Sequence, residues 1–152
     1  MIQTINLQKS YSGTVVLDLP DLRIGKGEVF GLVGNNGAGK TTFFSLVLDL
    51  IRATKGKVLI NDIEVAKSED WKELTSAYID ESFIIGYLTP DEYFNFIGEL
   101  RDMNANDISK FLAGFSEFFN DGIVGKKKFI RDLSKGNQKK VGVVGALMGN
   151  TE

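Results

Sequence analysis

The pattern of apolar and polar positions predicts strands in the first part of this 152-residue chain and helices in the second. In residues 4–11 (TINLQKSY) and 15–24 (VVLDLPDLRI) apolar residues recur between polar ones, and a turn at Ser12 and Gly13 separates the two stretches. Residues 28–34 (EVFGLVG) are almost entirely apolar, which is typical of a strand that is buried on both faces. We therefore expect two joined strands followed by a buried one.

A hairpin and a further strand are predicted beyond these. Residues 56–65 (GKVLINDIEV) predict a hairpin that turns at Asn61 and Asp62. Residues 76–80 (SAYID) predict another short strand, and residues 40–51 (KTTFFSLVLDLI) predict a helix. The first half of the chain thus mixes strands and a helix.

Helical spacing dominates from residue 89 onward. Thr89 is predicted as an N-cap, with Pro90 at the first helical position and Glu92 reaching back, and the helix continues through Leu100. The apolar face of a second helix comprises Ile108, Phe111, Leu112, Phe115 and Phe119. Seven of the eleven Phe lie within residues 94–129. We interpret this clustering as the small core of a helical insert; the alternative is a docking surface for a partner.

Composition excludes several kinds of chemistry. The chain is 43% hydrophobic and 25% charged, as expected for one globular domain, and it has neither an apolar window of membrane-spanning length nor a signal peptide. We therefore expect a cytoplasmic protein. With no Cys and no His, disulfides, thiolate nucleophiles, zinc clusters and imidazole bases are excluded. A net charge of -2 and a pI near 5.3 disfavour a nucleic-acid partner.

The firmest functional signal is the stretch GNNGAGKTT at residues 34–42, which matches the pattern G-x-x-x-x-G-K-[ST]. In this pattern backbone N–H groups surround phosphate oxygens, Lys40 reaches the outer phosphates and the Thr41 hydroxyl binds Mg²⁺. A predicted strand precedes the stretch and a predicted helix follows it, as the pattern requires. The nucleotide-binding residues expected here are Gly34, Asn35, Asn36, Gly37, Ala38, Gly39, Lys40, Thr41 and Thr42.

A second candidate lies in LSKGNQKKVGVVGALMG, residues 133–149. Ser134 is a plausible N-cap and Gly136 falls in the first turn of a helix whose apolar positions are Val141, Val144, Ala146 and Leu147. In isolation this segment would be a capped structural helix. A cluster of basic residues overlaps it and comprises Lys126, Lys127, Lys128, Arg131, Lys135, Lys139 and Lys140. We interpret that cluster as a solvated face, with docking of phosphates or of a membrane partner as the alternative.

Taken with the glycine-rich stretch, the LSKGN segment resembles the signature, usually written LSGGQ, of the ATP-binding subunits of ABC transporters. The resemblance covers nearly the whole chain. It implies an α/β fold, namely a P-loop NTPase core with N-terminal antiparallel β strands and a helical subdomain insert. It also implies a subdivision into residues 1–88 (P-loop and β core), 89–132 (helical subdomain) and 133–149 (signature helix).

The same resemblance assigns residue roles. Tyr11 would stack on adenine with Val16 near the ring edge, whereas the alternative for Tyr11 is an aromatic packed into the core. Ser134, Gly136 and Asn137 would complete, in trans, the γ-phosphate site of a second subunit, so that two subunits enclose two ATP molecules. The catalytic residues implied are Lys40 and, in trans, Ser134.

Two departures from the family pattern are visible. Lys135 and Asn137 replace the usual Gly and Gln of the signature. Asp80 or Glu81 stands where the family has a lid glutamine, which makes Asp80 a second candidate ligand for Mg²⁺ beside Thr41. Contacts in trans are therefore expected to differ in strength from those of the family.

The resemblance implies an ATPase that powers an integral membrane permease subunit and lies peripherally on the inner face of the cell membrane. In the family the strand that ends in Asp-Glu follows the signature helix, so we expect the first part of a longer ATPase, which binds ATP with Mg²⁺ but does not hydrolyse it alone. Two alternatives remain. Residues 77–81 (AYIDE) would be the Walker B strand of a compact P-loop kinase or NTPase, or the chain would be a nucleotide-sensing fragment without turnover.

Overall fold

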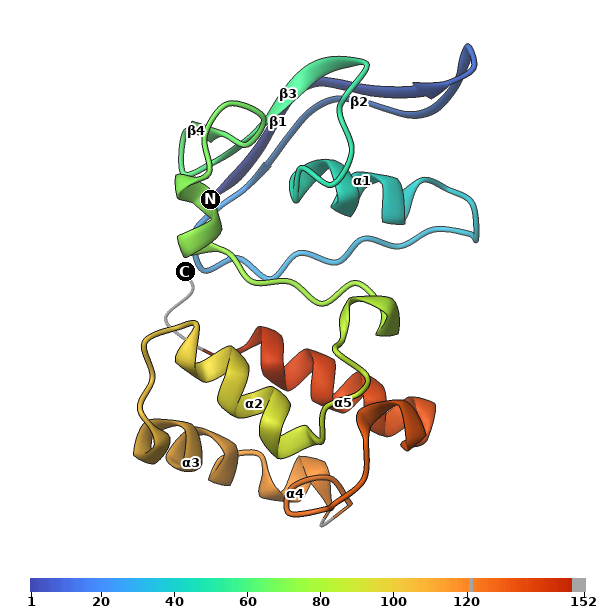
Figure 1. The fold of residues 1–152 in the computed structure, drawn as a ribbon. Coiled ribbons are helices and arrows are strands. Elements are labelled where there is room, and N and C mark those ends of the chain that lie inside the picture. The colour runs from blue at the N-terminus through green and yellow to red at the C-terminus, as the bar shows by residue number, and fades with distance from the viewer. Residues whose placement is uncertain (121, 149–152) are drawn as a thin grey trace. The chain divides into compact units, whose positions relative to one another are not determined.

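The structure, a computed structural model, describes residues 1–120 and 122–148, which form two compact units (Figure 1). The first unit is Met1–Thr75 and the second comprises residues 76–148. Each unit has its own apolar core. Residues 76–88 lie in the second unit, and the predicted subdivision into core, helical subdomain and signature helix stays a prediction.

The first unit is built on an antiparallel sheet with the strand order β2-β1-β3-β4 (Figure 1). Its strands are β1 (Ile2–Tyr11), β2 (Thr14–Ile24), β3 (Lys55–Ile60) and β4 (Ile63–Glu64). The predicted turns are confirmed, because Ser12 and Gly13 have φ of 48° and 82°, and Asn61 and Asp62 have φ of 46° and 65°. Gly, Asn and Asp adopt left-handed conformations more easily than other residues do, so residue type alone was enough to predict turns at these positions.

One helix, α1 (Lys40–Val47), packs against this sheet. The core of the unit consists of Leu7, Phe43, Leu46, Val47, Val58, Ile60, Val65 and Trp71, and Trp71 lies in a 3-10 turn at Asp70–Leu74. The helix ends four residues before the predicted residue 51. The reason is a left-handed Asp49 (φ 52°), after which the N–H of Leu50 donates to the carbonyl of Ser45 at 2.8 Å and closes the helix end.

The prediction of a buried strand at residues 28–34 is wrong. These residues form no strand, and Val29 and Val33 are 99% and 94% exposed. A β strand requires a neighbouring strand to pair with its N–H and C=O groups, and in the described residues the four strands of the sheet pair only with one another. The apolar run therefore follows an extended, exposed path between β2 and α1 (Figure 1).

The second unit is helical (Figure 1). Its elements are 3-10 turns at Glu81–Phe83 and Ile130–Asp132 and the helices α2 (Pro90–Glu99), α3 (Ala105–Ala113), α4 (Ser116–Phe119) and α5 (Lys135–Ala146). The capping box at Thr89 is confirmed, because its hydroxyl accepts from the N–H of Glu92 while the Glu92 carboxylate accepts from the N–H of Thr89. The predicted second helix is divided into α3 and α4.

The aromatic cluster largely forms the core of this unit. Phe94 and Phe119 are buried, and Phe111 and Phe115 pack against them. Three others, Phe96, Phe118 and Phe129, are 42%, 46% and 43% exposed, so the core interpretation accounts for only part of the clustering. On α5, Val141 and Val144 are buried as predicted, but Leu147 is 52% exposed. None of the helices in the described residues is long and apolar enough to cross a membrane.

The predicted strand at residues 76–80 is also wrong. These residues form no strand, and Tyr78 instead packs against the helical core. The ring of Tyr78 faces Gly142 of α5, where a Cβ atom would lie 2.2 Å from its Cε2 atom. Side-chain packing therefore decides the path of this segment. The reading of residues 77–81 as a Walker B strand has no support in the described residues.

Candidate nucleotide site

The glycine-rich loop needs glycine at its last position for two reasons. Gly39 has a φ of 86°, a left-handed conformation in which L side chains are strained. A Cβ atom at Gly39 would also lie 2.8 Å from the carbonyl oxygen of Val16 in β2. The loop can therefore enter α1 beside β2 only because residue 39 has no side chain. Val16, predicted near the adenine ring, thus lies beside the end of the loop through its backbone.

Lys40 closes the loop on itself. Its ammonium donates to the carbonyl oxygens of Gly34 and Asn35 at 2.6 and 2.8 Å, and so joins the first residue of α1 to the start of the loop. An ammonium has three N–H donors, so one remains for a phosphate oxygen. The lysine is thus held with its charge at the loop.

The remaining residues of the loop are accessible to a ligand. Residues 34–38 and Thr41 are exposed, and Thr42 is half-buried. The N–H groups of the first turn of α1 have no partner within the helix, and they carry the positive end of its dipole. This arrangement suits a polyanion held mainly by backbone.

Tyr11 lies at the end of β1 and is 50% exposed, so the alternative that packed it into the core is wrong. The ammonium of Lys9 lies 4.8 Å from the centroid of its ring. One face of the ring is thereby covered by a cation. The stacking of adenine on Tyr11 stays a prediction.

In the second unit, Ser134 is the N-cap of α5, as predicted, and its hydroxyl accepts from the N–H of Asn137 at 3.3 Å. Ser134, Lys135 and Gly136 are exposed, and no atom lies within 4 Å of the position of a Cβ at Gly136. The first turn of α5 therefore presents a hydroxyl and bare backbone N–H groups. Asn137 is half-buried.

Sequence reasoning missed the residue that holds this turn in place. Gln138 is 8% exposed, and its amide donates to the carbonyl oxygens of Arg131 and Leu133 at 3.1 and 2.9 Å. It lies on the same helix face as Val141 and Gly142, three and four positions later. A polar residue on an apolar face was the available signal, because a buried amide must find hydrogen-bond partners.

The carboxylate of Asp80 accepts hydrogen bonds from a residue of its own segment. Its Oδ1 accepts from the hydroxyl and the N–H of Ser82 at 2.5 and 2.8 Å, and these hydrogen bonds, the hydroxyl first, hold the pKa of Asp80 below its usual value. Thr41 belongs to the first unit and Asp80 to the second, so their joint role as Mg²⁺ ligands stays a prediction. Among residues 1–120 and 122–148, no group of three or more acidic side chains could hold a metal ion.

Glu81 and Lys135 form an ion pair with 3.8 Å between Oε1 and Nζ. They line a hollow with Asp80, Ser82, Ile84, Gly86, Ile130, Arg131 and Gln138. Both residues of this pair stand at positions where the sequence departs from the family pattern. The pair thus joins the segment after Tyr78 to the start of α5.

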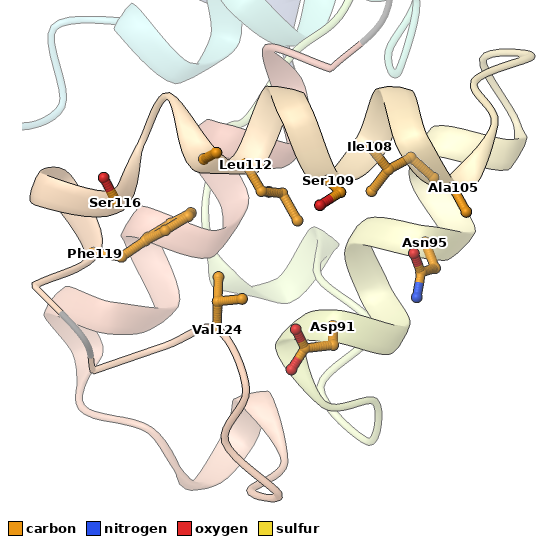
Figure 2. A pocket seen from close by; sticks show the side chains of 10 residues that line it. Asp91, Asn95, Ala105, Ile108, Ser109, Leu112, Ser116, Phe119 and Val124 are labelled. Carbon is orange, nitrogen blue, oxygen red and sulfur yellow. The ribbon is translucent and has the colours of Figure 1, made fainter.

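A second hollow lies within the helical unit (Figure 2). Its polar lining comes from Asp91, Asn95, Ser109 and Ser116, and its apolar lining from Ala105, Ile108, Leu112, Ala113, Phe119 and Val124. Figure 2 shows that α2 and α3 supply most of these side chains. None of the predicted nucleotide residues lines it.

Comparisons with known proteins agree on one family. A family model described as ABC transporter matches residues 17–152. An ABC transporter ATP-binding protein of Methanocaldococcus jannaschii is 31% identical over 99% of this chain and 53% of its own length. The bacitracin transport ATP-binding protein of Enterococcus faecalis is 32% identical over 100% of this chain and 48% of its own length. The chain spans about half the length of the curated relatives it matches.

Solved structures show the same fold. A dimeric ATP-binding cassette in a post-hydrolysis state, bound to ADP and Pi, is 21% identical and matches with a TM-score of 0.81. The match covers 99% of this chain and 71% of that one. The fold is therefore that of an ABC ATPase domain, an α/β P-loop NTPase.

Proposed function

We propose a function from the premise that the chain belongs to the ABC transporter family, among its ATP-binding subunits. The chain binds Mg-ATP at residues 34–42, with the backbone N–H groups of the loop and the Lys40 ammonium on the phosphates. Thr41 supplies a hydroxyl to Mg²⁺, and Asp80 is a second candidate ligand. Tyr11 stacks on the adenine. The observation that carries this proposal is an exposed loop in which the Lys40 ammonium is fixed by hydrogen bonds to the carbonyl oxygens of Gly34 and Asn35.

A second copy or a paired ATP-binding subunit completes the site. Ser134, Gly136 and Asn137 face the γ-phosphate bound by the partner, and each subunit does the same for the other. The exposed hydroxyl and open first turn of α5 support this role, because both can accept an anion without rearrangement of the helix. The dimeric cassette matched above is one precedent for such pairing.

The assembled protein powers an integral membrane permease from the cytoplasmic side, where this chain lies peripherally. Nucleic acid is not among the proposed partners. Bacitracin transport is the printed role of one relative, and no cargo is proposed for this chain.

A fluorescent-ATP titration with and without Mg²⁺ tests the binding site. Lys40→Ala should weaken ATP affinity at least tenfold, because a charge-assisted contact to phosphate is lost. Lys55→Ala is the matched control, since it removes the same charge from the exposed end of β3. Equal affinity of Lys40→Ala and wild type would contradict the P-loop assignment.

A further inference from the structure

Basic residues gather in one stretch of this acidic chain. Residues 122–140 hold seven of its 18 Lys and Arg but one of its 20 Asp and Glu. Within them, residues 124–131 (VGKKKFIR), here called the basic loop, contain four cations and no carboxylate. On a surface that is only solvated, positive and negative side chains are normally interspersed. The concentration of positive charge in this stretch therefore indicates a negatively charged partner.

The basic loop is anchored at both ends. At its start, the N–H of Gly125 donates to Oδ2 of Asp91 at 2.8 Å. At its end, the N–H groups of Ile130 and Arg131 donate to the carbonyl oxygens of Leu88 and Gly86 at 2.8 and 2.9 Å, and Ile130 is 1% exposed. The lysines between these anchors are therefore presented by a fixed backbone.

The three lysines are free to meet a ligand. Lys126, Lys127 and Lys128 are all exposed, and within the part of the chain that the structure describes they make no hydrogen bond or ion pair. Consecutive ammonium groups repel one another, and none of these three lysines is paired with a carboxylate within the described residues. A polyanionic surface would relieve it.

Exposed apolar side chains accompany these cations. Phe129 and Val124 are 43% and 39% exposed, and the guanidinium of Arg131 lies 5.3 Å from the centroid of the Phe129 ring. The same pairing occurs between helices α4 and α5 of this unit, where the Lys140 ammonium lies 5.1 Å from the ring centroid of Phe118, which is 46% exposed. A cation beside an exposed aromatic ring suits the boundary between lipid headgroups and acyl chains.

We propose that the basic loop binds anionic phospholipid headgroups at a membrane surface, with Phe129 entering the interface. Three of its four cations are lysines, which protein interfaces disfavour, whereas arginine is enriched there. A fluid array of headgroups needs point charges and no fixed bidentate geometry, which suits lysine. This contact goes beyond the proposed attachment through a permease, because the chain itself touches lipid.

Vesicle co-sedimentation of the purified chain tests the proposal. Wild type should bind vesicles of phosphatidylcholine mixed with phosphatidylserine and not vesicles of phosphatidylcholine alone, and added salt should weaken binding. Each lysine near an anionic bilayer strengthens binding about fivefold. The affinity for the anionic vesicles should therefore fall roughly 100-fold in the triple variant Lys126→Gln/Lys127→Gln/Lys128→Gln. Phe129→Ala should reduce the affinity for anionic vesicles by a smaller factor than the triple variant does. The triple Lys→Arg variant at the same positions should retain binding.

The control variant Lys55→Ala/Lys72→Ala/Lys110→Ala removes the same charge elsewhere and should change binding little. Three results would overturn the proposal: equal binding to neutral vesicles, no binding to anionic ones, or an equal loss in the control variant. A fourth would do so as well, namely an oligonucleotide that binds as tightly as the vesicles with no dependence on Phe129. Circular dichroism checks that the variants fold, and their ATP affinity is measured separately. A negative result with vesicles would therefore not count against the proposed nucleotide site.

Discussion

The ring of Tyr78 lies on the bare backbone of Gly142. Its Cε2 and Cδ2 atoms are 2.2 and 2.4 Å from the position that a Cβ of residue 142 would occupy. The Tyr78 hydroxyl is buried without a hydrogen-bond partner among the described residues, and burial, then the carboxylates of Glu81 and Asp80, raise its pKa. At Tyr78 the segment is therefore held against α5 by packing and not by a hydrogen bond of its hydroxyl, while the Glu81–Lys135 ion pair adds a surface contact.

Gly142→Ala should therefore destabilise the helical unit by about 2 kcal/mol, because the added methyl group displaces the Tyr78 ring from a packed core. Gly136→Ala is the matched control in the same helix. No atom lies within 4 Å of its added Cβ, so alanine should be neutral or slightly stabilising there. Urea unfolding of the two variants checks the difference, and equal midpoints would contradict this packing.

Gly39→Ala should lower both stability and ATP affinity. The left-handed φ alone costs about 1–2 kcal/mol for alanine, and the contact with the Val16 carbonyl adds to it. Gly37→Ala separates the two effects, because Gly37 has a φ of 83° and no atom within 4 Å of its Cβ position. Thermal unfolding and ATP titration should show the larger loss at residue 39. The close approach to β2 would be refuted by equal losses.

The cap of α2 should depend on pH through Glu92. The N–H of Thr89, and then its hydroxyl, donate to the Glu92 carboxylate and lower its pKa. Since the folded pKa lies below the unfolded value of about 4.3, this stabilisation is present above that value and is lost as pH falls through the folded pKa.

Glu92→Gln should therefore be less stable than wild type at neutral pH, with the difference shrinking in acid. Glu99→Gln, at the other end of α2, removes the same charge without a capping role and serves as the control. Unfolding midpoints across pH measure both variants. A difference for Glu92→Gln that does not change with pH would rule out this linkage.

Glu81→Gln tests the role of the segment after Tyr78. Glu81 pairs with Lys135 at the surface, where ion pairs contribute about 0–1 kcal/mol, so stability should change little. In the proposed function Glu81 does not position the attacking water, so single-turnover hydrolysis by the proposed assembled ATPase should stay near normal. Retained ATP affinity with a rate that falls 100-fold or more would instead assign Glu81 a catalytic role.

Local signals in the sequence determined the turns, the caps and the glycine-rich loop. Asn61 and Asp62, Thr89 with Glu92, and Ser134 each act through backbone groups within a few residues, so their residue types suffice to predict the structure. The pattern at residues 34–42 similarly predicts a glycine-rich loop that leads into a helix, and Gly37 and Gly39 in it are left-handed. Only the structure shows that Lys40 donates to the carbonyl oxygens of Gly34 and Asn35.

Contacts between distant residues decided the rest. Residues 28–34 and 76–80 have sequences typical of strands, yet a strand exists only where another strand pairs with it, and no local signal reports that partner. The fit of Tyr78 to Gly142 and the buried bonds of Gln138 also join segments that the sequence keeps apart. Only tertiary packing could reveal these contacts, because their free energy depends on which surfaces meet and not on residue type alone.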